Sequence, residues 1–175
     1  NHPETKIIDD IDASQIVNDR ELLAEALRAV DWPEGIKVQQ PQAEMLFEND
    51  IESIKKVTAH LRFPILAKPK LAGSTESAHM MRLVTSPEAL VGVSVPCLLQ
   101  EYINHGAVVY KIYALGDHIE VTARTSTRDI EPNENIELDF HSQKPNEKNG
   151  LWDHSVNLED VKIPIEKFKK CSAAL

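Results

Sequence analysis

Two lysines stand in aliphatic segments where folding alone gives no reason for a charge. Lys68 follows the run Phe63 to Ala67, which predicts a short buried strand, and Lys111 lies inside the run Val108 to Leu115. A lysine in an apolar strand must face solvent or meet an anion, because an isolated buried charge is costly. For a single lysine at a strand end, an ordinary surface position remains the commoner explanation. The chemistry that both positions favour is anion binding.

Small and polar residues follow Lys68 and favour the same chemistry. Gly73-Ser74-Thr75 would wrap a phosphate through backbone amides and hydroxyls, although such loops are also common turns. We expect His79 on a second strand, where a lone histidine is more often a surface or core residue than a ligand. A third strand over 96–103 ends in the polar kink Asn104-His105-Gly106.

The elements that would position these residues can be read from periodicity and turn signals. Apolar residues at helical spacing predict a helix that Asn18 caps, with Glu21 three residues on, and Asp50 is expected to cap a second helix. The inward residues are Leu22, Leu23, Ala26, Leu27 and Val30 in the first helix and Ile51, Ile54, Val57 and Leu61 in the second.

The second half of the chain is read as strands and a last helix. Alternating polarity predicts strands at 108–115 and 118–125 around a Gly116-Asp117 turn. Short connections favour three adjacent antiparallel strands within 95–125. We further expect a short helix from Ser86, a strand near 136–140, a helix within 159–174, and a strand or linker at 6–9.

Composition excludes several classes of function. The chain has 175 residues, with 19 Lys and Arg against 28 Asp and Glu, and its net charge of -9 argues against a nucleic-acid partner. Cys97 and Cys171 fit no metal-ligand spacing, and reduced thiols in a cytoplasmic protein are the simplest interpretation. No stretch is long and apolar enough to predict a membrane span.

These segments together resemble the inositol 1,3,4-trisphosphate 5/6-kinase and inositol-tetrakisphosphate 1-kinase family, over roughly residues 2–148. That family has the ATP-grasp fold, in which a nucleotide lies between two sheets. The segments that carry the resemblance are HPET at the start, Asp19-Arg20, FPILAKP, the loop ending in His79, and PCLLQEYINHGAVVYKIYALG, which is the strongest. Arg124-Thr125-Ser126 and Phe140-His141-Ser142 resemble later segments of the same family.

The resemblance implies a role for each matched residue. It places Lys111 and Arg124 among the catalytic cations, and His79 and Lys111 against an inositol polyphosphate. The residues that it places around ATP are Arg20, Lys68, Gln100, Glu101, Tyr102, Ile103, Ser126 and Ser142. The four consecutive residues of this set would present backbone groups to adenine, although the same pattern also fits the plain edge of a strand.

The resemblance also implies the fold and the extent of the chain. We expect an α+β ATP-grasp core with antiparallel sheets, incomplete at both ends. Residues 1–17 would be a linker from a missing N-terminal domain, 18–103 the N-terminal lobe, and 104–175 part of the C-terminal lobe. The family usually has glycine where Ser74 stands. Its carboxylate ligands for Mg2+ lie on later strands, so the chain alone is expected to be inactive.

The implied function is ATP-dependent transfer of the γ-phosphate to a hydroxyl of an inositol tris- or tetrakisphosphate, by a monomeric cytoplasmic enzyme. One alternative is a catalytically inactive ATP-grasp module with a binding or structural role. A third reading, an ATP-grasp ligase that forms an acyl phosphate, is disfavoured by the INH and YK motifs near residues 103–111.

Overall fold

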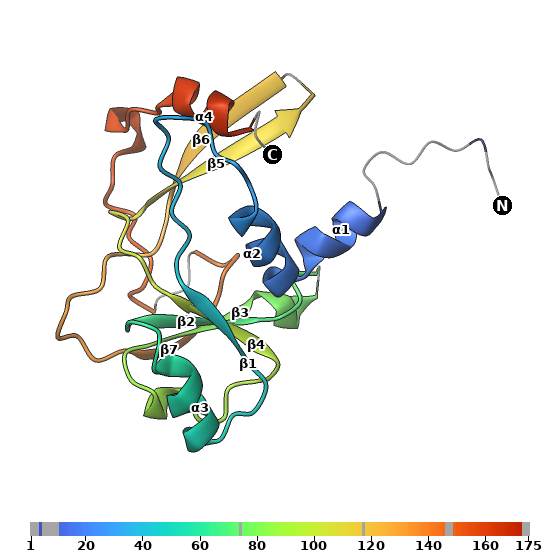
Figure 1. Cartoon of the computed structure of the whole chain (residues 1–175). Helices are drawn as coiled ribbons and strands as arrows, with labels where there is room; N and C mark the ends of the chain where they lie inside the picture. Colours follow the sequence, from blue (N-terminus) through green and yellow to red (C-terminus); the bar gives the residue numbers. More distant parts are fainter. Residues whose placement is uncertain (1–3, 5–10, 74, 117, 146–148, 173–175) are drawn as a thin grey trace.

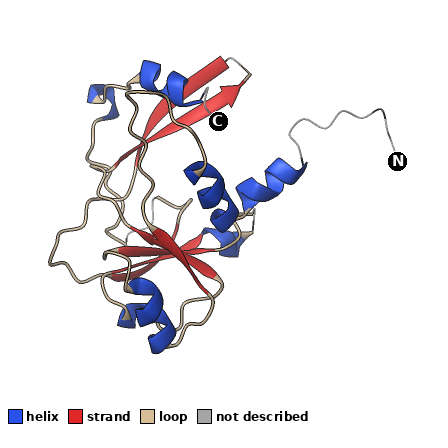
Figure 2. Ribbon diagram, viewed as in Figure 1, coloured by secondary structure: helices blue, strands red, loops and turns tan. Residues whose placement is uncertain are grey.

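The computed structural model describes residues 4, 11–73, 75–116, 118–145 and 149–172. These residues form helices and antiparallel sheets (Figures 1 and 2), which confirms the α+β class. The α-helices are α1 (Ile11–Asn18), α2 (Arg20–Arg28), α3 (Ile51–Thr58) and α4 (Ile165–Ser172), and the 3-10 helices are η1 (Glu76–His79), η2 (Glu88–Leu90) and η3 (Leu158–Asp160). The strands are β1 (Ala43–Leu46), β2 (Ile65–Pro69), β3 (Met80–Val84), β4 (Cys97–Glu101), β5 (Val108–Leu115), β6 (His118–Thr125) and β7 (Glu137–His141).

Most strands belong to one antiparallel sheet of five, in the order β1-β4-β2-β3-β7, and β5 and β6 form a separate hairpin. The prediction of three adjacent strands within 95–125 is therefore wrong. Both edges of β4 are already occupied, by β1 on one side and by β2 on the other, so no edge remains for β5. The hairpin itself has the predicted bounds, and Gly116 adopts the positive φ of 54° that its turn requires.

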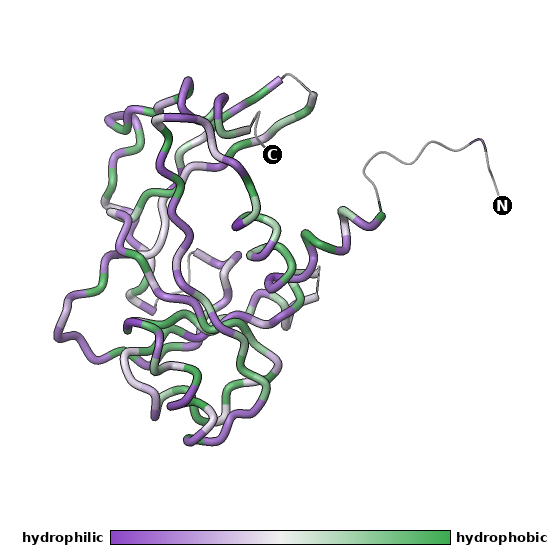
Figure 3. The backbone as a smooth tube through the Cα atoms, in the orientation of Figure 1, coloured by the Kyte–Doolittle hydropathy of each residue, from purple (hydrophilic) through white to green (hydrophobic). Residues whose placement is uncertain are grey.

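The two faces of the five-stranded sheet pack against different partners. Ile65 and Ala67 of β2 point to the face that α3 covers, where Ile54 and Leu99 are fully buried. Successive side chains of a strand alternate between faces, so Leu66 and Lys68 point to the opposite side. We call this second side the lysine face. Figure 2 shows α2 and α3 on opposite sides of the sheet, and Figure 3 shows hydrophobic stretches gathered within it.

A second apolar cluster lies on the lysine face. Leu83 and Phe140 of β3 and β7 pack there with Ile130, Ile136 and Leu151 from the segments that flank β7. Leu66 contacts this cluster from β2. The cluster holds the chain that follows β6 against the sheet.

The sequence predicts the N-cap of α3 correctly and the N-cap of α2 wrongly. Asp50 caps α3 as expected, accepting from the amides of Glu52 and Ser53 at 3.0 Å each. For α2 the predicted cap at Asn18 is wrong, because Asn18 ends α1 and its carbonyl accepts from Ala72 at 2.8 Å. Asp19 is the cap instead, in extended backbone.

The remaining expectations are met in part. The structure has η2, β7 and α4 close to the predicted positions, and α4 packs on the hairpin through the rings of Phe168 and Tyr110, 5.2 Å apart. His79 is not on a strand as predicted but ends η1. The expected strand or linker at 6–9 lies outside the described residues. None of the described helices is both long enough and apolar enough to cross a membrane.

The packing on the α3 face can be tested through one buried and one exposed residue. Ile54 has no exposed surface, so Ile54→Ala should lower the free energy of unfolding by about 2–5 kcal/mol through lost burial and a cavity. Leu115 is 79% exposed, and Leu115→Ala should change it by no more than about 0.5 kcal/mol. Urea unfolding of both variants measures this, and equal losses would contradict the assigned core.

Candidate nucleotide and acceptor site

Lys68 is held on the lysine face by its neighbour strand. The register places Lys68 opposite Leu98 and Leu66 opposite Gln100, so these side chains share one face. The Lys68 ammonium donates a hydrogen bond to Oε1 of Gln100. Burial, and secondarily the nearby charge of Arg20, lowers the pKa of Lys68 from 10.5 to about 8. The lysine is thus destabilised in its charged form by its surroundings.

Arg20, at the start of α2, braces the loop that follows β2. Its guanidinium donates to the carbonyls of Pro69 and Leu71 near one end of the loop, the latter at 2.9 Å. It also donates to the Ala78 carbonyl near the other end, at 3.0 Å. Burial lowers the pKa of Arg20. The arginine predicted to contact the nucleotide therefore fixes the loop that follows β2. Ser74 of that loop lies outside the described residues.

Arg20 and Lys68 differ from the other partly buried cations because neither forms an ion pair with a carboxylate among the described residues. Each of the others has an acidic partner within 4 Å; the pairs are Lys70 with Asp19 and Glu21, Arg82 with Glu137 and Asp139, and Arg128 with Glu134. Two desolvated cations that repel one another leave a net positive charge on the lysine face. Such a pair is suited to an anionic ligand.

The structure brings His79 beside Ser142. The Ser142 amide donates to the His79 carbonyl at 2.9 Å, and the rings of His79 and His141 lie 5.4 Å apart at 42°. His141 is buried, with Nε2 3.5 Å from the Glu76 carboxylate. The residue predicted on the acceptor side and the one predicted on the nucleotide side are thus neighbours. Sequence reasoning gave His141 no role, although it stands in a matched segment.

The residues predicted to meet adenine differ in whether their backbone amides are free to donate a hydrogen bond. The Glu101 carboxylate points to the α3 face, where its hydrogen bonds with Arg62 lower its pKa. The amides of Glu101 and Tyr102 donate to Gln42 and Pro64, at 2.9 and 2.8 Å. The Ile103 amide donates no hydrogen bond within the described part of the chain, and Ile103 is 49% exposed. Ile103 therefore has the open backbone donor.

Lys111 and Arg124 lie on the hairpin, away from β2. The register pairs Lys111 with Thr122 and Val109 with Arg124, so the two cations share one face of the hairpin. The Arg124 guanidinium donates to the Tyr113 hydroxyl at 2.9 Å, and Lys111 is exposed. No hydrogen bond or ion pair between described residues joins either cation to Lys68. Ser126, directly after β6, is buried against His105, with 2.9 Å between Oγ and Nε2.

A comparison with known families decides what these elements are. A sequence model of the inositol 1,3,4-trisphosphate 5/6-kinase ATP-grasp domain matches residues 34–173, which is most of the chain. The chain belongs to this family. The five-stranded antiparallel sheet and its lysine therefore belong to an ATP-grasp core, as the sequence predicts.

Relatives within this ATP-grasp family are similar over different shares of their length. Inositol-tetrakisphosphate 1-kinase 1 of Zea mays is 28% identical over 178 residues, covering 95% of this chain and 52% of its own. Inositol-tetrakisphosphate 1-kinase 3 of Glycine max is 29% identical over 74% of the chain and 37% of its own. The Xenopus laevis inositol-tetrakisphosphate 1-kinase is 31% identical over 74% and 33%. The chain thus spans about half, or less, of the length of these relatives.

Magnesium is the metal that the family resemblance implies, and the part of the chain that the structure describes does not fit it. Among the described residues there is no group of three or more His, Cys, Asp or Glu side chains that could hold a metal ion. Asp19 and Glu21, the carboxylates on either side of Arg20 in the sequence, are already paired with Lys70.

The lowered pKa of Lys68 predicts a pH dependence of stability. Between pH of about 8 and 10.5 the folded protein releases a proton that the unfolded chain retains, so the free energy of unfolding rises with pH in this window. Lys68→Met lacks this titration. Urea unfolding at the two ends of the window should show wild type gaining up to about 3 kcal/mol relative to the variant. Parallel pH profiles would contradict the desolvated lysine.

Proposed function

We propose that the protein is an ATP-dependent kinase that transfers the γ-phosphate to a hydroxyl of an inositol tris- or tetrakisphosphate. The observation that carries the proposal is the pair of desolvated cations, Arg20 and Lys68, without a carboxylate partner. A kinase does little covalent chemistry with its side chains; it aligns two reactants and neutralises the charge of the phosphoryl group. Charges held in place by the fold, Lys68 on β2 and Arg20 at the start of α2, are what that task needs.

The nucleotide would lie across the lysine face. Lys68 and Arg20 would meet its phosphates, and the loop that Arg20 braces would cover them with backbone amides. The Ile103 amide is the donor for adenine, because the preceding amides are already engaged. Gln100 lies between these points and orients Lys68. Ser126 and Ser142 complete the proposed nucleotide side.

The acceptor would approach from the side of His79. Because the Ser142 amide holds the His79 carbonyl, the proposed nucleotide and acceptor residues meet at the junction of β3 and β7. We place the transferring phosphoryl group near this junction. Lys111 and Arg124 on the hairpin face would supply further positive charge to a polyphosphate acceptor, with Lys111 acting as a point charge.

The division of labour between the two lysines can be measured by calorimetric titration of the purified protein. Lys68→Ala should weaken ATP binding roughly tenfold to a hundredfold, for the loss of one charge-assisted contact, and change inositol tetrakisphosphate binding little. Lys111→Ala should do the reverse. Lys56→Ala is the matched control, because Lys56 lies on α3, which covers the opposite face of the sheet.

The outcomes separate the proposal from its alternatives. Unchanged inositol phosphate affinity in Lys111→Ala would make Lys111 an ordinary solvated residue and remove the acceptor assignment. ATP binding without any inositol phosphate binding in the wild type would favour a nucleotide-binding module with another role.

A further inference from the structure

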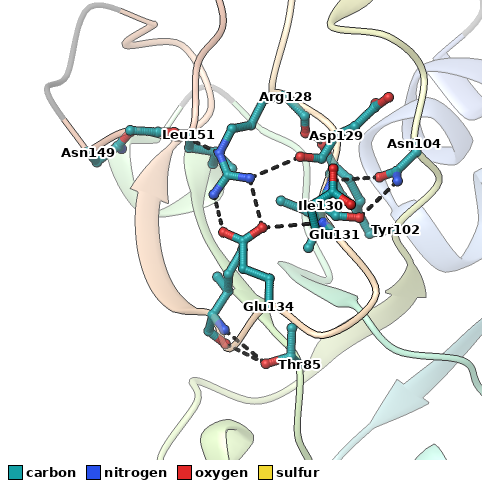
Figure 4. Close-up of polar contacts among 12 residues, drawn as sticks. Thr85, Tyr102, Asn104, Arg128, Asp129, Ile130, Glu131, Glu134, Asn149 and Leu151 are labelled. Carbon is teal, nitrogen blue, oxygen red and sulfur yellow. Dashed lines mark hydrogen bonds and ion pairs between the residues drawn. The ribbon is translucent and has the colours of Figure 1, made fainter.

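The connection between β4 and β5, residues 102–107, is called the hinge, and the segment that follows β6 holds it in place. This segment, Ser126 to Ile130, is called the clamp below. The Asn104 side-chain amide exchanges two hydrogen bonds with the backbone of Ile130, at 3.0 and 2.9 Å (Figure 4). One carboxylate oxygen of Asp129 accepts from the amides of His105 and Gly106, at 2.9 Å each. The hinge is therefore held at three consecutive residues.

The clamp is itself anchored, so it does not move freely with the hinge. Arg128 forms an ion pair with Glu134 and donates to the carbonyls of Gly150 and Asp129, each at 3.0 Å (Figure 4). Its amide donates to the Leu151 carbonyl at 2.8 Å, and Leu151 is buried in the cluster on the lysine face. The conformation of the hinge is thus tied to the packed core.

His105 has a specific place in this arrangement. Its Nδ1 lies 2.8 Å from the Ile103 carbonyl oxygen, and its Nε2 lies 2.9 Å from the Ser126 hydroxyl. A carbonyl only accepts hydrogen bonds, so Nδ1 carries the proton and donates it. In the neutral ring Nε2 then accepts from the Ser126 hydroxyl. The ring therefore occupies the carbonyl of Ile103. Separately, the Ile103 amide has no hydrogen-bond partner among the described residues.

From this geometry we propose that His105 is a positioning residue that sets the purine specificity of the nucleotide site. The inference rests on the proposed function, since it needs a purine at the hinge. With the Ile103 carbonyl held by His105, the hinge presents a donor at residue 103. Adenine places an acceptor, N1, on its Watson–Crick edge, whereas guanine places a donor, N1–H, at the same position. A donor facing a donor leaves both unpaired, so guanine is rejected.

Two substitutions of His105 separate its two hydrogen bonds. In His105→Asn the side-chain amide nitrogen takes the place of Nδ1 and keeps the bond to the Ile103 carbonyl. In His105→Gln the amide takes the place of Nε2, near Ser126, and the bond to Ile103 is lost. The two variants are matched in chemistry, so a general loss of packing affects both, and only the hinge bond distinguishes them.

The experiment measures dissociation constants of wild type and both variants for ATP and GTP by calorimetry. Wild type should bind ATP about a hundredfold more tightly than GTP. This ratio should persist in His105→Asn and fall about tenfold in His105→Gln. An equal ratio in all three proteins, or a ratio near one in wild type, overturns the inference and leaves the kinase proposal standing.

A wild-type measurement keeps the inference testable if the variants do not fold. A triphosphate of 1-deazaadenosine lacks the N1 acceptor, and wild type should bind it about tenfold more weakly than ATP. Equal affinity would show that the Ile103 amide does not read N1 and would overturn the inference. Wild type that binds neither ATP nor GTP would overturn the proposed function, and the inference with it.

Discussion

The site depends on two cations that the fold desolvates and leaves without a carboxylate. Burial lowers the pKa of both Arg20 and Lys68, and the charge of Arg20 further disfavours the protonated Lys68. Elsewhere in the described chain, partly buried cations such as Arg82 and Arg128 have acidic partners. An arrangement that costs stability in the absence of a ligand is typical of a site that gains its missing charge on binding. We propose that the phosphates of a nucleotide supply this missing negative charge.

The two faces of the sheet differ: one is packed as a core, and the other carries the candidate site. The α3 face carries an apolar core in which Ile54, Ile65 and Leu99 have no exposed surface. The lysine face combines a smaller apolar cluster with Lys68 and Gln100. Because β4 is paired along both edges, Gln100 and the hinge that follows it have little freedom to shift. The packed core on the α3 face thus helps to fix the positions of Lys68, Gln100 and the hinge on the other side.

Local patterns were enough to predict the elements that follow short-range rules. Asp50 caps α3, the hairpin has its predicted bounds, and Lys68 stands on a buried strand as the run before it indicates. The sequence was less informative where long-range contacts decide. The four residues of β1 carry no strong strand signal and owe their conformation to β4, and the same pairing removes the edge on which β5 was expected.

The site shows the same limit. The family resemblance implied that Arg20 is a nucleotide ligand, but only the structure shows that its guanidinium donates hydrogen bonds to the carbonyls of Leu71 and Ala78. The clamp that holds Asn104 and His105 joins residues more than 20 positions apart, so no local pattern indicates it. The INH motif, residues 103–105, indicated that the hinge has a role, but it did not indicate which contacts hold the hinge.

We propose that a nucleotide lies on the lysine face and that its base meets the amide of Ile103. Amide hydrogen exchange, with and without a non-hydrolysable ATP analogue, tests it most directly. We expect the Tyr102 amide, which is hydrogen-bonded to the Pro64 carbonyl, to be protected from exchange in both states. The Ile103 amide should exchange rapidly in the free protein and become protected when the analogue is bound. Saturating analogue that leaves Ile103 exchange unchanged would contradict the account.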